Sequence, residues 1–544
     1  MVPPASVRVS SPPAGAWAES LTMGAGRSVH FPFLSVALKP PSLFAADGGL
    51  TTPGTTMPFF TLEDFKISFS FFCTVYGIGT LGLPANFARS GAPIATVALL
   101  FMGFANVCSC VAISRVCLAA PKNLKTYGDI GEWCCGKIGR YLVLLAQFGV
   151  CLLVPCAYLV LGGILLDGIS PGAFGTQYWS IIMAAMLLPV IVTPTLKEGA
   201  YAAFAGCMGT VLADAIAISV LAVGVGNDHP PVPHPDIKFS EAASSFGNLA
   251  LAYSAAVLVP ALQREHSQPE RMPRVVACTM IFAACCFLII GETSYSYVGC
   301  QIPGNLLFAI NGTALNLNAN RGAVVLAYMF MQLHITIAMS VILNPVLYIL
   351  ERGVLGMHKR PLLPAIDEES PAFEVISTPQ TRLGEKEGTP NVATGRPSVT
   401  SMADAEHDLT PEALLHEYHN SGPVVIAKYV TLRICVVVIL LILAIIFKDH
   451  FMDFSDFVGA WAVSLACIIL PIFFYLKVFW NRTPWYEKII GAFIIVVCAC
   501  LGAYVTYTTG HDLFLDIVSD KTFQYCPDEY SEVVYTNTTY YGNN

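Results

Sequence analysis

The chain has 544 residues, of which 55% are hydrophobic and only 12% charged, and its mean hydropathy is +0.62. Soluble domains carry roughly twice that share of charged residues, which excludes a soluble multidomain enzyme. The net charge of −8 comes mainly from carboxylates in one loop and the C-terminal tail, and no basic stripe indicates a nucleic-acid partner. We therefore expect an all-α polytopic membrane protein.

The composition changes sharply along the chain. Residues 1–61 are rich in Pro, Ser, Gly and Ala and predict a disordered cytoplasmic tail. Apolar runs fill residues 62–356 and 424–508, which we interpret as transmembrane helices one to eight and nine to eleven. The acid-rich segment 357–423 predicts a disordered cytoplasmic linker, and a non-cytoplasmic tail follows at 509–544. Most of the 18 cysteines lie in apolar runs without metal-ligand spacing, so we expect no metal site and no cofactor.

Apolar runs of sufficient length predict eleven spans, because a bilayer core needs about 20 apolar residues per helix. In chain order they are 63–90, 93–119, 138–167, 178–195, 198–224, 243–264, 275–299, 322–350, 425–447, 455–478 and 487–508.

Basic residues alternate between the connecting segments and predict the orientation. Lys and Arg are concentrated after the second, sixth, eighth and tenth spans, while 168–177 has none and 225–242 has only Lys238. The positive-inside rule then places the N-terminus in the cytoplasm. The sequons at Asn311 and Asn537 both fall on the predicted non-cytoplasmic side, as glycosylation requires.

Two cysteines also fall on the predicted non-cytoplasmic side. Cys300 and Cys526 can form a disulfide there, since that side favours oxidation. The alternative is two free thiols near the membrane surface.

The first predicted span is interrupted by small residues and a proline. Residues 76–84 read YGIGTLGLP, and three glycines and a proline are costly in a helix. The string also fits GxGxxG, but no strand precedes it, so we reject dinucleotide binding. It indicates either an unwound segment that binds a carboxylate through its backbone, or close helix packing through small residues.

The sixth span is interrupted in a similar way. Residues 244–256 read SSFGNLALAYSAA, and Pro260 follows. Broken helices at the first and sixth positions are expected if spans one to five and six to ten form inverted repeats. Sequence identity between the two halves is not evident, so the repeat is inferred from position alone. This favours the unwound segment over simple packing.

Several segments resemble the amino acid/auxin permease family. They are GIGTLGLPANFARSG at 77–91, TYGDIG at 126–131, QFGVCLLVPCAYLVLG at 147–162, VPALQREHSQPERMP at 259–273 and NPVLYILE at 344–351. The likeness covers 62–352 well and 424–508 loosely, and the long acidic linker departs from the family's short loop. The resemblance implies a leucine-transporter-type (LeuT-type) fold, with a 5+5 inverted repeat plus an eleventh helix. It also implies amino acid symport with protons or sodium.

The resemblance further implies that the two breaks hold the substrate. The first break would bind the substrate's carboxylate and amino group through backbone atoms of Tyr76, Gly77, Ile78, Gly79, Thr80 and Leu81. The second would face it with Ala252, Tyr253, Ser254 and Ala255, of which Tyr253 is a candidate gate. Tyr158 would donate its hydroxyl to the carboxylate. For Tyr158 and Tyr253, ordinary packing with a satisfied hydroxyl is the alternative.

Ionisable residues inside spans are candidates for coupling to an ion. Asp214 lies mid-span in the fifth helix, where a buried carboxylate can pick up a proton near neutral pH. His334 of the eighth helix can titrate or be a hydrogen-bonded core residue, and Glu292 of the seventh lies nearer the outer face. Sodium-coupled relatives carry Asn and Thr where this chain has Cys73 and Ala338, which are poor sodium ligands. We therefore predict proton coupling.

We therefore predict a proton-coupled amino acid symporter that works by alternating access in a lipid bilayer. The alternatives are a sodium-coupled symporter, an amino-acid sensor with little flux, a channel, and a membrane enzyme using His334. No catalytic pattern such as Ser-His-Asp, HExxH or a P-loop supports an enzyme. The sequence leaves open which amino acid or related solute is carried, the oligomeric state, and whether the membrane is the plasma membrane or a vacuolar or lysosomal one.

Overall fold

The structure is a computed structural model of the whole chain. It describes residues 59–121, 124, 126–192, 199–226, 229–311, 315–317, 319–357, 422–515 and 521–541. Within these ranges the chain forms helices and connecting turns and no β-strand, and the all-α class is confirmed. The predicted N-terminal tail and acidic linker fall almost entirely outside the described residues.

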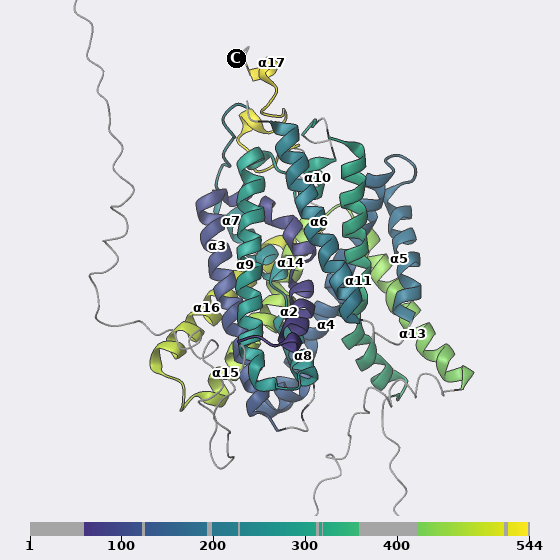
Figure 1. Cartoon of the computed structure of the whole chain (residues 1–544), viewed down its shortest axis with the longest axis vertical. Coiled ribbons are helices and arrows are strands. Elements are labelled where there is room, and N and C mark those ends of the chain that lie inside the picture. Colours follow the sequence, from purple (N-terminus) through teal and green to yellow (C-terminus); the bar gives the residue numbers. More distant parts are fainter. Residues whose placement is uncertain are drawn as a thin grey trace, which may run out of the picture.

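The helices run through the chain in the following order and pack into one bundle (Figure 1). They are α2 (Leu62–Val75), α3 (Ile78–Ala119), α4 (Tyr127–Ile169), α5 (Thr176–Val192), α6 (Gly199–Val225), α7 (Phe239–Ala252), η2 (Ala256–Leu258), α8 (Val259–Glu265), η3 (Pro269–Arg271), α9 (Met272–Val298), η4 (Gly299–Gln301), α10 (Leu306–Ile310), α11 (Arg321–Val354), α13 (Pro423–Ile446), α14 (Phe451–Val458), the π-helix η5 (Gly459–Ile469), α15 (Leu470–Phe479), α16 (Trp485–Phe514), η6 (Asp528–Tyr530) and α17 (Thr538–Tyr541).

Each of the eleven predicted runs overlaps helix in the described ranges, and residues 193–195 and 198 of the fourth and fifth runs lie outside them. Nine helices in the described ranges are long and apolar enough to cross a membrane alone, and α5 is shorter, with 17 residues. α3 has 42 residues and would extend about 60 Å, roughly twice the hydrocarbon thickness of a bilayer. Its backbone leaves the helical region at Gly91, where φ is 73°. The two halves of α3 therefore correspond to the end of the first predicted span and to the second.

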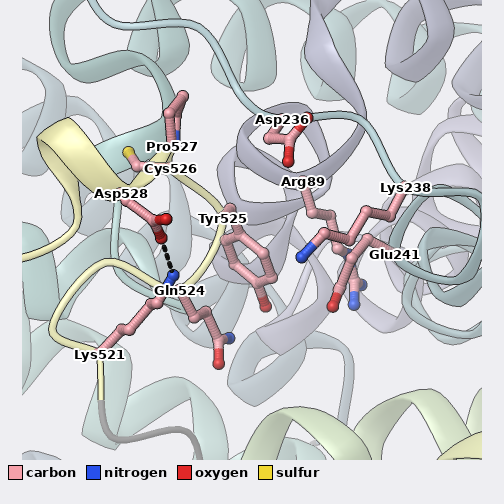
Figure 2. A pocket seen from close by; sticks show the side chains of 10 residues that line it. All are labelled: Arg89, Asp236, Lys238, Glu241, Lys521, Gln524, Tyr525, Cys526, Pro527 and Asp528. Atoms are coloured by element: carbon pink, nitrogen blue, oxygen red, sulfur yellow. Dashed lines mark hydrogen bonds and ion pairs between the residues drawn. The ribbon is translucent and has the colours of Figure 1, made fainter.

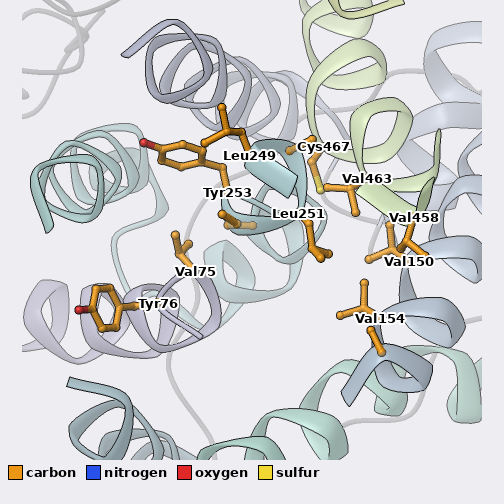
Figure 3. Packing of buried hydrophobic residues seen from close by; sticks show 14 of the residues in the cluster. Val75, Tyr76, Val150, Val154, Leu249, Leu251, Tyr253, Val458, Val463 and Cys467 are labelled. Carbon is orange, nitrogen blue, oxygen red and sulfur yellow. The ribbon is translucent and has the colours of Figure 1, made fainter. Parts of the chain in front are cut away.

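The first and sixth spans are interrupted, as the LeuT-type arrangement requires. The first consists of α2 and the start of α3, and the sixth of α7, η2 and α8. Figure 3 shows Leu251, from the end of α7, lying between Val75 of α2 and Val463 of the tenth span. The breaks thus meet in the interior of the bundle.

The bundle has two ends, which we name from the chain segments found there. The tail end carries the C-terminal residues 521–541, above α10 in Figure 1. The linker end is where α11 and α13 meet the undescribed segment between them. Between the ends, the outward faces of the helices are apolar: Ile439 of α13 is 57% exposed and Val496 of α16 is 59% exposed. A broad exposed apolar face is what a bilayer requires.

The last span is longer than predicted. α16 continues to Phe514, six residues beyond the predicted end at 508. Thr509 is buried there, and its hydroxyl donates to the carbonyl of Val505 at 2.6 Å, so the helix satisfies this polar group internally. Hydropathy cannot register such a turn, because His511 and Asp512 end the apolar run.

Candidate functional site

The break in the first span leaves polar backbone groups in the bundle interior. α2 ends at Val75, and Tyr76 leaves helical geometry with φ −87° and ψ 80°. Gly77 is also non-helical, with φ −141° and ψ −138°, before α3 begins at Ile78. The first amides of α3 have no carbonyl partner within their own helix, and the positive end of the helix dipole points into the break. Such a terminus suits an anionic group.

The break in the sixth span covers Tyr253 to Ala255. Ser254 N–H donates to Leu251 at 3.2 Å and Ala255 N–H to Tyr253 at 2.7 Å, neither of which is an α-helical pattern. A short 3₁₀ turn, η2, then leads into α8. The carbonyls that end α7 are therefore released from the helical ladder beside the first break.

The two breaks are in direct contact. A Cβ atom added at Gly79 would lie 2.8 Å from the Cβ of Ala252 and closer still to its Cα. About two turns further along α3, the side-chain amide of Asn86 donates to the side-chain oxygen of Asn248 at 2.9 Å. The structure thus brings together the two segments expected to hold substrate, at a point where only glycine fits.

Two ionisable side chains flank the first break. Asp214, on α6, is 2% exposed and faces the hydroxyls of Tyr76 and Thr80. Both carboxylate oxygens lack a hydrogen-bond partner among the described residues. The Thr80 hydroxyl donates instead to the carbonyl of Gly77, at 2.8 Å. A buried carboxylate without a partner is costly while it is charged, so this position favours proton uptake or a cationic ligand.

His334, on α11, approaches the same break from another side. It is 1% exposed, and its Nδ1 lies 3.2 Å from the carbonyl oxygen of Gly206. Its Nε2 points at the first break, 2.6 Å from where a Cβ on Gly77 would stand, and has no hydrogen-bond partner in the described part of the chain. One ring nitrogen is thus held by backbone while the other is free to exchange a proton or contact a ligand.

The remaining predicted residues have different surroundings. Tyr158, on α4, is buried near Cys73 of α2. Tyr253 is fully buried against Phe287 with ring centroids 4.9 Å apart, and its hydroxyl has no hydrogen-bond partner in the described ranges. The carboxylate of Glu292 accepts a 2.5 Å hydrogen bond from Thr96, on the second span, so it already has a partner there.

A buried ion pair at the tail end was missed by sequence reasoning. Arg89 Nη1 lies 2.7 Å from Asp456 Oδ2, and Nη2 lies 3.2 Å from Asp456 Oδ1. The same Nη2 donates to Asn86 at 2.7 Å. Arg89 is 3% exposed and Asp456 is 1% exposed. The sequence did contain a signal for this pair, because Arg89 and Asp456 place opposite charges inside two predicted spans. The pair ties the first span to the tenth above the site.

Close backbone packing between the sixth and tenth spans adds to the contacts at the tail end. Gly247 of α7 and Gly459 of η5 approach closely through their backbones: a Cβ added at Gly459 would overlap the carbonyl of Gly247, and one added at Gly247 would overlap the backbone of Asp456. The sixth and tenth spans therefore meet as closely as two helices can. Together with the Arg89–Asp456 pair, this contact seals the tail end of the site.

The linker end is held by a different set of contacts. Asp64, in the first turn of α2, pairs with Arg271 at 2.6 Å and lies 2.8 Å from His266 Nε2, so α2 is tied to the connection between the sixth and seventh spans. Between α2 and α6 the described contacts include Phe69 and Phe204, with ring centroids 5.1 Å apart. The ion pair therefore joins α2 to η3, whereas the seam between α2 and α6 includes apolar packing.

Comparison with known proteins gives consistent matches. A profile of the family described as transmembrane amino acid transporter protein matches residues 64–511. The vesicular inhibitory amino acid transporter of Xenopus tropicalis is 20% identical over 84% of this chain and 78% of its own. Amino acid transporter AVT1I of Arabidopsis thaliana is 28% identical over 27% of this chain, and vacuolar amino acid transporter 7 of Saccharomyces cerevisiae (strain ATCC 204508 / S288c) is 22% identical over 43%.

Coverage of these relatives is uneven. The aligned part spans 38% of AVT1I and 49% of the yeast protein. Among solved structures, the crystal structure of MhsT in complex with L-phenylalanine matches with a TM-score of 0.49 and 11% identity, over 82% of this chain and 98% of that one.

Proposed function

The chain belongs to the transmembrane amino acid transporter family, a family of multi-pass membrane proteins, and from that premise we propose that it is a proton-coupled amino acid symporter. The observation that carries the proposal is the pair of helix breaks in contact at Gly79 and Ala252, with Asp214 and His334 beside them. Relatives named as transporters give no support to an enzyme.

The substrate's two charged ends suit the two breaks. An amino acid carboxylate at Gly77–Gly79 would meet the amides and the positive dipole of α3. Its ammonium would meet carbonyls released at the end of α7, near Tyr253. Both groups would be recognised mainly through backbone, which accounts for the small residues at these positions. The side chain of the amino acid would extend beyond them.

The proton site in this proposal is Asp214. Protonation would remove an uncompensated negative charge beside the first break, and the neutral acid could donate to a neighbouring oxygen. His334 offers a second exchangeable nitrogen 2.6 Å from the Cβ position of Gly77. Cys73 and Ala338 stand where sodium-coupled relatives carry oxygen ligands, which further favours protons.

Transport would proceed by alternating access. The tail end is sealed by the Arg89–Asp456 pair and the Gly247–Gly459 contact, whereas apolar packing contributes to the α2–α6 seam. In the proposed cycle, the first and sixth spans rock against the rest and open one end at a time. The positive-inside rule, applied to the loops rich in Lys and Arg, would place the linker end in the cytoplasm. The tail end, with the Cys300–Cys526 disulfide and the sequons, would then lie on the oxidising side of the membrane.

Reconstituted uptake tests the proposal directly. Purified protein in proteoliposomes should accumulate radiolabelled amino acids when an inward proton gradient is imposed, and a proton ionophore should abolish the accumulation. Replacing sodium by choline should change nothing at fixed pH. Uptake that vanishes in choline would refute proton coupling, and saturable binding without flux would instead identify a sensor.

A further inference from the structure

The connection between the sixth and seventh spans carries an exposed serine that the proposed transport mechanism does not use. Between the end of α8 at Glu265 and the start of η3 at Pro269 the chain is not helical, and residues 267–270 are exposed. This stretch follows α8, which lies below α2 toward the linker end in Figure 1. An exposed, irregular segment is open to an enzyme that binds its protein substrate in an extended form.

Ser267 is bonded to the first turn of α2. Its N–H donates to Glu63 Oε1 at 2.7 Å, and its hydroxyl donates to Oε2 of the same carboxylate. Hydrogen bonds to an ionised acceptor are roughly twice as strong as those between neutral groups. The Glu63 side chain is 38% exposed, so this contact joins α2 to the connection on the solvent side.

A buried contact lies next to this exposed one. The Asp64 carboxylate is 1% exposed, and it lies 2.8 Å from His266 Nε2 and 2.6 Å from Arg271 Nη2. Asp64 follows Glu63 in the chain, and His266 precedes Ser267. The exposed and the buried contact therefore form one attachment between the first turn of α2 and the same short segment, and a change in one is transmitted to the other.

Phosphorylation would reverse the role of the Ser267 side chain. A hydroxyl can donate to a carboxylate, whereas a phosphoserine carries about −1.5 to −2 charges at pH 7 and presents acceptor oxygens. At this position the phosphate would face the Glu63 carboxylate that the hydroxyl now holds, with the charge of Asp64 close by. Like charges and the loss of the donor would both push α2 away from the connection.

The neighbouring arginines offer the phosphate no place that leaves the attachment intact. Arg271 donates through Nε and Nη2 to Asp64, and its Nη2 also donates to the carbonyl of Phe59 at 3.1 Å. Arg274 Nη1 donates to the same carbonyl at 3.1 Å. A phosphate that reached Arg271 would compete with Asp64 for its guanidinium. Repulsion of Glu63 and competition for Arg271 thus have the same effect on α2.

We propose that Ser267 is a phosphorylation site through which a serine/threonine kinase releases α2 at the linker end. Arg264 stands three residues before Ser267 and is exposed, as a kinase that selects basic residues near its target serine requires. In the reaction, Ser267 Oγ attacks the γ-phosphorus of ATP, the bond from that phosphorus to the bridging oxygen breaks, and ADP leaves. The hydroxyl proton passes to the catalytic base of the kinase.

The modification would regulate the transport cycle from outside the substrate site. The contact of Ser267 is in the first turn of α2, at the opposite end of that helix from the break at Tyr76 and Gly77. With this attachment weakened, the linker end would open more readily, since Phe69 and Phe204 contribute only apolar packing to the α2–α6 seam. This regulatory role rests on the proposed function, which also places the linker end in the cytoplasm, where ATP is found.

Ser267→Glu and Ser267→Gln are a matched pair of variants, because only Glu adds a charge and only Gln keeps a donor for Glu63. In nanodiscs, amide hydrogen exchange of residues 65–75 should be about fivefold faster in Ser267→Glu than in the wild type, and within about twofold in Ser267→Gln. Adding Glu63→Gln to Ser267→Glu should slow the exchange again. Constant exchange in α13 reports an intact fold. Equal exchange in the Glu and Gln variants would overturn the release of α2.

Mass spectrometry detects the modification itself in full-length protein from eukaryotic cells treated with a serine/threonine phosphatase inhibitor. Trypsin cleaves after Arg264 and Arg271, and Ser267 is the only hydroxyl-bearing residue of the released peptide. We expect a phosphopeptide that disappears after phosphatase treatment. An unmodified peptide would overturn this proposal and leave the proposed function standing. A phosphorylated protein that transports no amino acid, yet exchanges faster as Ser267→Glu, would overturn only the proposed function.

Discussion

Gly79 of the first span lies against Ala252 of the sixth so closely that no side chain can be accommodated between them. This contact joins the two interrupted helices at the point where each loses its helical hydrogen bonds. Both segments must keep their backbone within reach of one ligand if they bind it together. The contact therefore determines how far apart the two breaks can stand.

Gly79→Val should abolish amino acid uptake and leave surface expression intact. The added atoms would overlap Ala252 and push the breaks apart, an overpacking cost of typically 1–3 kcal/mol. Gly353→Val on α11 is the control, since a Cβ there meets nothing within 4 Å and uptake should stay within about twofold. Uptake assays with surface biotinylation measure both; normal transport by Gly79→Val would contradict the model of a shared backbone site.

Arg89→Met should destabilise the protein, because it leaves Asp456 buried and unpaired. Breaking one side of a buried pair costs about 3–5 kcal/mol, and thermal unfolding of the purified protein should show the loss. Arg89→Met with Asp456→Leu should regain most of that stability without regaining transport. Strictly additive losses in the two single variants and the double variant would mean that the two charges do not interact.

Asp214→Asn should flatten the pH dependence of uptake. An amide cannot bind the coupling proton, so acidifying the outside of proteoliposomes should accelerate the wild-type protein and not the variant. Glu292→Gln is the control, because Glu292 already accepts a hydrogen bond from Thr96 and its loss should preserve the profile. If Asp214→Asn retains the wild-type profile, the proton is carried elsewhere, and His334→Gln becomes the next variant to measure.

Replacing both Cys300 and Cys526 by Ser should weaken the attachment of the tail cap (residues 521–541) to the seventh span. A disulfide typically contributes 2–4 kcal/mol, and without it residues 521–541 would be held by the hydrogen bonds of Gln301, the bond from Asp236 N–H to the Tyr525 carbonyl and the buried Phe523 ring. Amide hydrogen exchange should rise in the cap and stay constant in the spans. Cys285→Ser removes an exposed free thiol and should change neither region. Unchanged exchange in the cap would show that the polar contacts suffice.

Thr539→Ala should remove a glycan from Asn537 and thereby test the orientation of the membrane domain. The change destroys the Asn-Thr-Thr sequon, whereas Thr538→Ala preserves it, so only the first should reduce the gel shift produced by an endoglycosidase, leaving the part that comes from Asn311. Asn537 is exposed at the tail end, as an acceptor must be. A wild-type chain from eukaryotic cells that shows no shift would argue for the opposite orientation.

The interrupted helices could be predicted from sequence because their cause is local. Glycine, proline and serine weaken a helix wherever they occur, so 76–84 and 244–256 could be singled out without knowledge of their partners. Their position as first and sixth spans followed from counting apolar runs. These two features account for most of the fold that could be anticipated.

Contacts between distant residues could not be anticipated in the same way. Arg89 and Asp456 are 367 positions apart, and nothing local to either one indicates the other. The approach of His334 to Gly77 depends on how the eighth span is rotated, which an almost uniformly apolar helix does not reveal. The cavity lined by Arg89, residues 236–241 and residues 521–528 (Figure 2) requires three separate segments of the chain to converge, which no local pattern indicates.

The bond between Cys300 and Cys526 also has a consequence for biogenesis. Cys526 follows the eleventh span, whereas Cys300 ends the seventh, so the bond can close only after all later spans have been inserted. An incompletely inserted chain would expose a free thiol at position 300. Oxidation of this pair is thus a chemical record that the membrane domain has been completed.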